Sequence, residues 1–178
     1  LLQPFKDWIQ SRLDRFFYRD RFDYRRTLIE FGRTLTNEVR LDPMLGSVMD
    51  RISQTLLVDR LALFLEDPAA PGRFTLARSM GVRSAESLDL SFLSADRPQL
   101  ARGYLFYESP RSAPGASESV RRTIAELDLN YYIPCRIRER TVAVLGLGKT
   151  VDGDFLTSED VELLFTIAGY VAIAMDNA

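Results

Sequence analysis

Histidine is absent from this chain of 178 residues, and cysteine occurs once, at Cys135. The absence of histidine excludes Ser-His-Asp and Cys-His catalysis, a histidine-ligated haem, histidine-containing zinc sites and a phospho-acceptor histidine within these residues. One cysteine cannot form an intramolecular disulfide, and no signal-peptide pattern opens the chain, so we expect a reducing, cytoplasmic setting. A run of about 18 apolar residues is also missing, so we expect any membrane attachment to come from a segment outside this chain.

The charges are distributed unevenly along the chain. Residues 1–40 carry nine Lys and Arg against six Asp and Glu, whereas the remaining residues carry 14 against 19. The arginines alternate with acids and the pI is about 5.3, which differs from the concentrated basic face of a nucleic-acid-binding protein. We therefore expect no nucleic-acid partner. The opening residues lack an initiator Met, and we expect the chain to be a piece of a longer protein.

Residues 5–36 predict one long helix. Its apolar residues recur at intervals of three and four, and the stripe changes face near Asp20. A narrow stripe on a long charged helix is typical of a coiled coil, so we predict that this helix packs against a partner helix. The alternative is that the stripe packs against its own domain. The residues predicted at the dimer interface are Phe17, Tyr24, Leu28, Phe31, Leu35, Ile167, Tyr170 and Val171.

Residues 42–116 predict a helix followed by mainly strand segments. Asp42 and Pro43 are typical of a helix N-cap and first helical position. A buried strand at Leu61–Leu65 and a second strand at 73–81 are joined by a Pro- and Gly-rich turn, which predicts an antiparallel pair. Weaker signals predict a short helix around Phe92–Leu100 and a strand in "GYLFYES".

The last third of the chain carries the clearest local signals. An amphipathic helix is predicted from Ser117, followed by a hairpin of Tyr131–Ile137 and Thr141–Leu147. Pro134 cannot donate to a ladder, so we expect it at an edge or a bulge. The final helix is predicted to begin with Thr157 or Ser158 as its cap and acids in its first turn. This order of elements predicts an α+β fold with a largely antiparallel sheet.

Residues 37–178 resemble a GAF domain. The resemblance rests on "LDPMLGSVMDRISQTLLVDRLALFLED" near the start and on "YIPCRIRERTVAVLGLGKTVDGDFLTSEDVELLFTIAGYVAIAMDNA" at the end. It implies a central antiparallel sheet flanked by helices. The preceding "QSRLDRFFYRDRFDYRRTLIEFGRTLTNEV" resembles the helix that joins a membrane-embedded region to a GAF domain in bacterial sensor histidine kinases. This implies a linker helix at 1–36, a sensor domain at 37–178, a covalently linked output domain and a place on the cytosolic side of the inner membrane. It also implies a parallel homodimer through the first and last helices, residues 1–36 and 158–178.

The resemblance implies sensing or signal relay and no catalysis by this fragment. Cyclic-nucleotide-binding relatives carry Asn-Lys, Phe and Asp-Glu elements, but here Gly148-Lys149 replaces the first and Glu159-Asp160 reverses the last. Haem and bilin are not expected without histidine, and the cofactor stays unassigned. We therefore predict a homodimeric domain of a sensor histidine kinase that binds a small molecule or relays a membrane signal. The alternative is a ligand-free dimerisation module that feeds a serine phosphatase or cyclase.

Candidate ligand residues follow from the variable segments with which GAF domains close a cavity. Aromatic side chains with an arginine suit a planar or anionic ligand, although half-buried tyrosines are also ordinary in strands. Cys135 would act as a redox sensor only if positive charge favoured its thiolate, and the alternative is a buried structural cysteine. No metal site is predicted. The candidate ligand residues are Arg102, Tyr104, Tyr107, Tyr131, Tyr132 and Cys135.

Overall fold

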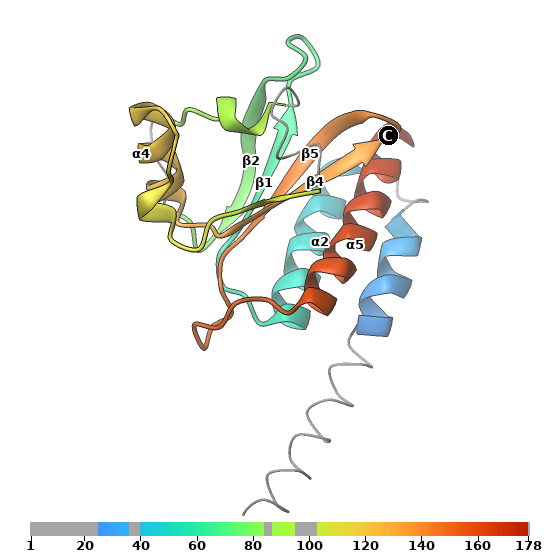
Figure 1. Ribbon diagram of the computed structural model, residues 1–178. Helices are drawn as coiled ribbons and strands as arrows, with labels where there is room; N and C mark the ends of the chain where they lie inside the picture. Colours follow the sequence, from blue (N-terminus) through green and yellow to red (C-terminus); the bar gives the residue numbers. More distant parts are fainter. Residues whose placement is uncertain (1–24, 36–39, 84–86, 95–102, 178) are drawn as a thin grey trace, which may run out of the picture.

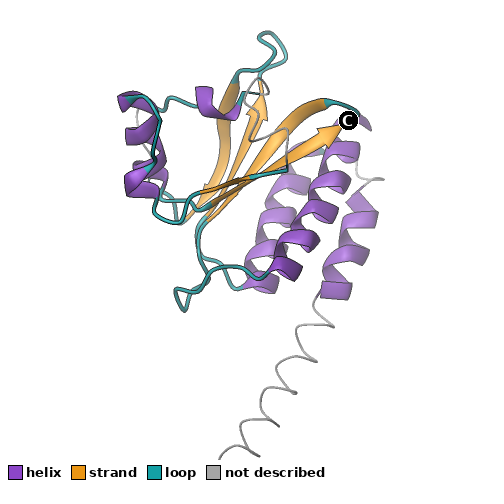
Figure 2. Ribbon diagram, in the orientation of Figure 1, coloured by secondary structure: helices purple, strands orange, loops and turns teal. Residues whose placement is uncertain are grey.

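A five-stranded antiparallel sheet lies at the centre of the fold, and helices cover both of its faces (Figures 1 and 2). The computed structural model describes residues 25–35, 40–83, 87–94 and 103–177. The strand order is β2-β1-β5-β4-β3, which confirms the predicted α+β class and antiparallel sheet. The strands are β1 (Leu61–Glu66), β2 (Phe74–Met80), β3 (Leu105–Phe106), β4 (Tyr131–Ile137) and β5 (Arg140–Leu147).

Three helical segments pack on one face of the sheet: residues 25–35, α2 (Leu41–Leu56) and α5 (Ser158–Asn177) (Figure 1). Because α2 repeats apolar residues at helical spacing, one of its sides is buried against the sheet. The helix α5 is apolar around more of its circumference, and it buries residues against both the sheet and segment 25–35. We call this the helical core. Its largest fully buried members include Leu28, Leu45, Ile52, Leu61 and Leu63.

A second core lies on the opposite face, under α4 (Glu118–Leu127) and two short 3₁₀ helices, η1 (Ser91–Leu93) and η2 (Pro110–Ser112). Gly146 in the central strand β5 lets this layer approach the sheet closely. A Cβ there would lie 2.7 Å from Leu129 Cδ1 and 3.2 Å from Phe64 Cε2. A larger residue at this position would therefore push the second core away from the sheet.

Strand alternation divides the residues of β4 and β5 between the two cores. Ile133 and Leu145 belong to the helical core, whereas Tyr132 and Val144 belong to the core under α4. Successive side chains of a strand point to opposite faces, and a sheet covered on both faces buries both sets. This explains why the strands are nearly continuous apolar runs.

The β4–β5 hairpin forms as predicted, with its turn one residue shorter than expected because β5 begins at Arg140. Arg138 takes a left-handed conformation, with φ 55°, to close the turn. Pro134 pairs with Val144 on β5, and β3 reaches only as far as Tyr132 on the other side of β4. The prediction for Pro134 is confirmed, since no described strand pairs with it on the side away from β5 and a register shift follows at Cys135 and Arg136.

The predicted start of α2 is wrong by two positions. Leu41 is already helical, Arg40 occupies the N-cap without a side-chain cap, and Asp42 therefore lies in the first turn. Pro43 is tolerated there because the first backbone N–H groups of a helix have no intrahelical acceptor. The helix predicted from Ser117 is α4, and Ser117 is its N-cap, accepting a hydrogen bond from the Val120 N–H at 3.5 Å.

Between β2 and α4, regular structure is shorter than predicted. The helix expected around Phe92–Leu100 appears as η1 over Ser91–Leu93, with residues 95–100 outside the described part, and the strand expected in "GYLFYES" is the two-residue β3. The predicted boundary at residue 36 and most of the predicted N-terminal helix also lie outside the described residues. In the part of the chain that is described, no helix is long and apolar enough to cross a membrane.

Candidate functional site

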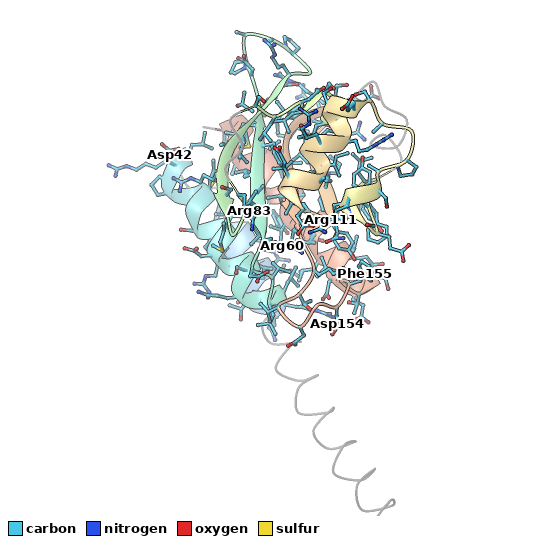
Figure 3. All side chains as sticks on the ribbon, turned by 90° about the vertical axis from the view of Figure 1, so that its left-hand side faces the viewer. Asp42, Arg60, Arg83, Arg111, Asp154 and Phe155 are labelled. Carbon is cyan, nitrogen blue, oxygen red and sulfur yellow. The ribbon has the colours of Figure 1, made fainter. Side chains whose placement is uncertain are left out.

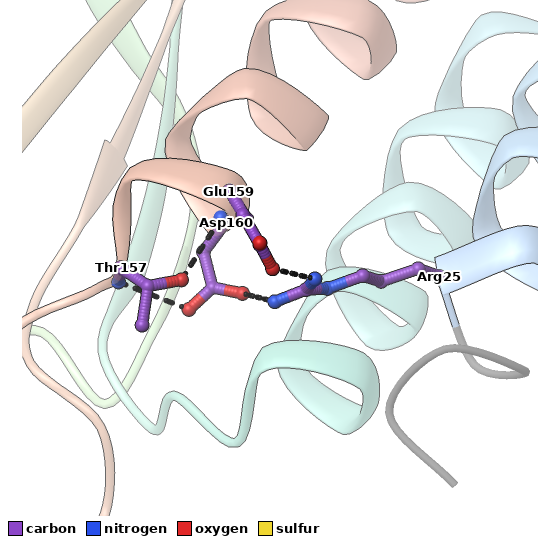
Figure 4. A network of polar contacts seen from close by, with 4 residues as sticks. All are labelled: Arg25, Thr157, Glu159 and Asp160. Atoms are coloured by element: carbon purple, nitrogen blue, oxygen red, sulfur yellow. Dashed lines mark hydrogen bonds and ion pairs between the residues drawn. The ribbon is translucent and has the colours of Figure 1, made fainter. Parts of the chain in front are cut away.

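A polar junction joins the N-terminal helical segment to the start of α5 (Figure 4). Arg25 Nη2 donates to Asp160 Oδ1 at 2.7 Å, and Arg25 Nη1 donates to Glu159 Oε2 at 2.6 Å. The Asp160 side chain is 4% exposed and that of Arg25 is 19% exposed, whereas Glu159 is 59% exposed. The ion pair with Asp160 is therefore largely shielded from water, where such pairs are strongest. We call these residues, with Thr157, the Arg25 junction.

Asp160 has a second role in this junction. Its Oδ2 accepts from the Thr157 backbone N–H at 3.1 Å, and the Thr157 hydroxyl accepts from the Asp160 N–H at 3.2 Å. This reciprocal pair is a capping box that begins α5. The prediction of Thr157 as a cap and of acids in the first turn is confirmed. The Asp160 carboxylate both caps α5 and binds Arg25 of the N-terminal helical segment.

Segment 25–35 also contacts the helical layer through its apolar side. A Cβ at Gly32 would lie 2.8 Å from Tyr170 Cδ2 and 3.1 Å from Ile167 Cδ1, so glycine permits close approach to α5. The Arg51 guanidinium of α2 lies 5.1 Å from the centre of the Phe31 ring. Contacts of this kind contribute about 0.5–1 kcal/mol at exposed sites. The segment is thus held by both α5 and α2.

Several residues predicted at a dimer interface are buried within the chain itself. Leu28, Leu35, Ile167 and Val171 are all at most 2% exposed in the helical core, so the prediction that these side chains face a partner is wrong. The alternative, that the stripe packs on its own domain, holds for residues 25–35. Phe31 and Tyr170 are half-buried, and Phe17 and Tyr24 lie outside the described residues. The homodimer itself stays a prediction.

The predicted ligand residues do not line one cavity. Tyr131 and Cys135 lie in the helical core, whereas Tyr132 lies in the opposite core with Tyr107 packed against it. The reason is strand alternation, which separates Tyr131 from Tyr132. Tyr104 stacks on Tyr131, with ring centroids 6.4 Å apart, and so belongs to the first group. Arg102 lies outside the described residues.

Cys135 is a structural cysteine. Its side chain is fully buried between the sheet and the helices, and burial raises the pKa of the thiol to about 12. The thiolate is the reactive form of cysteine, so a buried thiol with a raised pKa is inert toward oxidants at neutral pH. The possibility that Cys135 acts as a redox sensor is therefore wrong for this conformation.

An aromatic cluster occupies the sheet face under α4, formed by Phe64, Phe92, Tyr107 and Tyr132. The Phe92 ring meets the Tyr132 ring edge-on, with centroids 5.2 Å apart, and Phe64 and Tyr107 lie 6.1 and 6.0 Å from the same ring. Burial raises the pKa of Tyr132, and among the described residues its hydroxyl has no hydrogen-bond partner. A buried hydroxyl without a partner costs stability.

Replacing Tyr132 by phenylalanine is expected to raise the free energy of unfolding by about 1 kcal/mol, because it removes this unpaired hydroxyl. Tyr131→Phe is the matched control. It is expected to lower the free energy of unfolding by about 1 kcal/mol, because the Leu156 N–H that donates to the Tyr131 hydroxyl at 3.0 Å loses its acceptor. Urea unfolding followed by circular dichroism measures both. A less stable Tyr132→Phe variant would mean that the hydroxyl has a partner in the native protein.

Among the described residues, no group of three or more Cys, Asp or Glu side chains is placed to hold a metal ion. Glu159 and Asp160 have structural roles: both carboxylates bind Arg25, and Asp160 also caps α5. Arg25 was not among the predicted site residues, although a charged residue three positions before the buried Leu28 is a signal that could have suggested an ion pair.

Comparisons with known proteins agree with this architecture. Residues 40–177 match the GAF domain family, and a search of curated proteins found no match. The fold is similar to the GAF domain of a protein described as a sensor histidine kinase from Pseudomonas syringae pv. tomato, with TM-score 0.59 and 22% identity over 90% of each chain.

Two further structures are similar at lower identity. The GAF domain of an Acinetobacter phosphoenolpyruvate-protein phosphotransferase gives TM-score 0.59 at 14% identity, covering 88% of this chain and 93% of that one. A GAF domain/HD domain protein from Geobacter sulfurreducens gives TM-score 0.60 at 15% identity, covering 78% and 94%. With a family match over residues 40–177 and the same arrangement of sheet and helices, the chain belongs to the GAF domain family.

Proposed function

We propose that this chain is the regulatory domain of a bacterial sensor histidine kinase, and that it transmits a signal by changing how the N-terminal helical segment packs against α5. The Arg25 junction is the observation that carries this proposal. It links two helices at opposite ends of the described chain through a shielded ion pair and a helix cap. A change in the position of either helix must stretch or break these bonds.

The positions of the two linked helices support a relay. Segment 25–35 leads into the domain and α5 leads out of it, and both lie on the same face of the sheet (Figure 1). Packed helices usually respond to a signal by small translations or rotations of about 1–2 Å, which a charge pair with good geometry can convert into a choice between two arrangements. The output domain would then respond to the position of α5.

The kinase assignment is supported by the sensor histidine kinase among the similar structures, whose domain covers 90% of this chain. A second candidate is a ligand-free structural module that feeds a serine phosphatase or cyclase. The packing of the aromatic cluster favours a ligand-free sheet face, because Phe64, Phe92 and Tyr132 fill the space next to the sheet with their own rings. Both candidates use the same helix relay.

We further propose that the protein works as a homodimer, attached to the cytosolic side of the inner membrane by a segment outside this chain. Since Leu28, Leu35, Ile167 and Val171 are buried, the contacts would involve outward side chains of α5. Phe165 and Ile173 are large apolar residues of α5 that remain exposed. Light scattering of the chain measures the mass directly, and a monomer at tens of micromolar would contradict the dimer.

The relay predicts that Arg25→Gln changes the output of the full-length protein. The substitution keeps a polar, uncharged side chain at this position but removes the guanidinium that binds Asp160 and Glu159. We expect autophosphorylation to change by about fivefold or more, the usual lower range of coupling between two sites. Phosphatase and cyclase assays on the same protein test the second candidate.

Arg26→Gln is the matched control for this experiment. Arg26 is adjacent, but it is highly exposed, and its one ion pair within the described residues is with Glu30 on its own helix, at 3.4 Å. Such a pair contributes little, and the output should stay at the wild-type level. Equal output from wild type, Arg25→Gln and Arg26→Gln would rule out the Arg25 junction as the relay.

A further inference from the structure

Four arginines from separate parts of the chain line a groove of about 860 Å³ at the C-terminal end of α4. Arg60 precedes β1, Arg83 follows β2, Arg111 belongs to η2 and Arg122 belongs to α4. Figure 3 shows the labelled side chains Arg60, Arg83 and Arg111 close together on this side of the molecule. We call this the arginine groove. It is separate from the Arg25 junction, which lies on the other face of the sheet.

The groove has a surplus of positive charge. Among the described residues, its lining contains the four arginines and two acids, Glu126 and Asp128. Arg60 forms an ion pair with Asp128, which neutralises one arginine with one acid. Arg122 approaches Glu118 at 3.4 Å, but both side chains are mostly exposed and such a pair contributes little. Within the described residues, Arg83 and Arg111 have no ion pair at all.

Two glycines, Gly148 and Gly81, lie in close contact with the segment around Arg60 and so fix the position of the chain next to Arg60 and Arg83. A Cβ at Gly148 would lie 2.7 Å from Arg60 Nε, so the guanidinium of Arg60 packs directly over this glycine. The Gly148 N–H also donates to the Arg60 carbonyl at 2.9 Å. Gly81 has φ +67°, and a Cβ there would lie only 2.0 Å from the Asp59 carbonyl oxygen. Only glycine fits in that position, two residues before Arg83.

We propose that the arginine groove binds a small compound carrying two or more adjacent phosphate groups. Guanidinium groups bind phosphate oxygens bidentately, and arginines from different walls can share the several oxygens of neighbouring phosphates. A single carboxylate has two oxygens, and one guanidinium can bind both of them. The volume is within the range of about 300–1,000 Å³ found for small-molecule sites, which is large for inorganic phosphate alone and suits a nucleoside diphosphate.

Pyrophosphate, ADP, adenosine and citrate are the probes that test this site, by isothermal titration calorimetry on the 178-residue chain. We expect pyrophosphate and ADP to bind and to compete with each other, and adenosine not to bind. The double variant Arg83→Gln/Arg111→Gln should weaken the binding of both pyrophosphate and ADP by about tenfold or more, because each lost guanidinium removes charge-assisted hydrogen bonds. Both side chains are exposed, so the variant should keep the wild-type circular dichroism spectrum.

Two single variants act as controls with opposite expectations. Arg73→Gln removes an exposed arginine from the loop at the other end of β1 and β2, and should leave binding unchanged. Glu126→Gln removes an acid from the groove, and should tighten pyrophosphate binding about threefold or more through reduced repulsion. Misfolding cannot produce tighter binding, so this variant tests the site directly.

Three results would overturn the proposal. They are no binding of pyrophosphate or ADP at millimolar concentration, an equal loss of binding in Arg73→Gln, and citrate binding as tight as pyrophosphate, which would mark a general polyanion surface. None of these outcomes bears on the relay through Arg25, because the two sites share no residue.

Discussion

Replacing Asp160 by alanine is expected to lower the free energy of unfolding by about 3 kcal/mol. The carboxylate makes two kinds of contact that alanine cannot make: the capping hydrogen bond to the Thr157 N–H and the ion pair with Arg25. Loss of a helix cap costs about 1 kcal/mol. Removing one partner of a buried ion pair costs up to about 3–5 kcal/mol because the other charge is left unpaired, and the 19% exposure of Arg25 reduces this share.

Glu159→Ala separates these effects from simple loss of charge. Glu159 binds the same guanidinium at 2.6 Å, but it is 59% exposed and does not cap α5. Exposed ion pairs contribute about 0.2–1 kcal/mol, so this variant should remain close to wild type. Urea unfolding at constant ionic strength gives both values from the shift of the midpoint at unchanged slope. Similar losses in the two variants would mean that the burial of Asp160 has no energetic consequence.

Local elements of the fold were predictable because their causes lie within a few residues. Ser117 caps α4 through a bond to Val120, and Thr157 caps α5 through Asp160, three positions away in each case. The β4–β5 hairpin likewise needs only two apolar runs and a short polar turn. The start of α2 was misplaced because proline is compatible with several positions in a first turn, so Pro43 alone does not fix the N-cap.

The candidate sites depend on contacts between residues distant in the sequence, and local patterns do not contain them. Arg25 and Asp160 are 135 positions apart. Arg25 lies inside the predicted helix 5–36 and Asp160 in the predicted first turn of the last helix, and neither local pattern points to the other. The arginine groove is similar, because its arginines come from four separate segments. The separation of Tyr131 from Tyr132 is different. Neighbouring residues of a strand point to opposite faces, so their separation follows from the sequence alone. The two tyrosines share a residue type suited to a ligand site, but their adjacent positions in β4 place them in different cores.

The packing of the sheet face under α4 gives the other large expected effect, in Phe92→Ala. Phe92 is 1% exposed, and its ring meets Tyr132 edge-on inside the aromatic cluster. Truncating a buried phenylalanine costs about 3–5 kcal/mol, which combines lost burial with the cavity that remains. The edge-to-face pair adds about 0.5–1.5 kcal/mol to what a plain apolar contact would contribute. We therefore expect Phe92→Ala to lower the free energy of unfolding by about 4 kcal/mol.

Phe106→Ala is the matched control, because Phe106 also contacts aromatic rings but is 46% exposed. We expect it to cost about 1 kcal/mol, since water already reaches much of the ring. If Phe92→Ala were equally mild, the ring could leave the sheet at little cost, and a ligand could take its place. A large loss means instead that Phe92 is a fixed part of the core. In that case the sheet face under α4 holds the two cores together, and the proposed relay would act through the Arg25 junction.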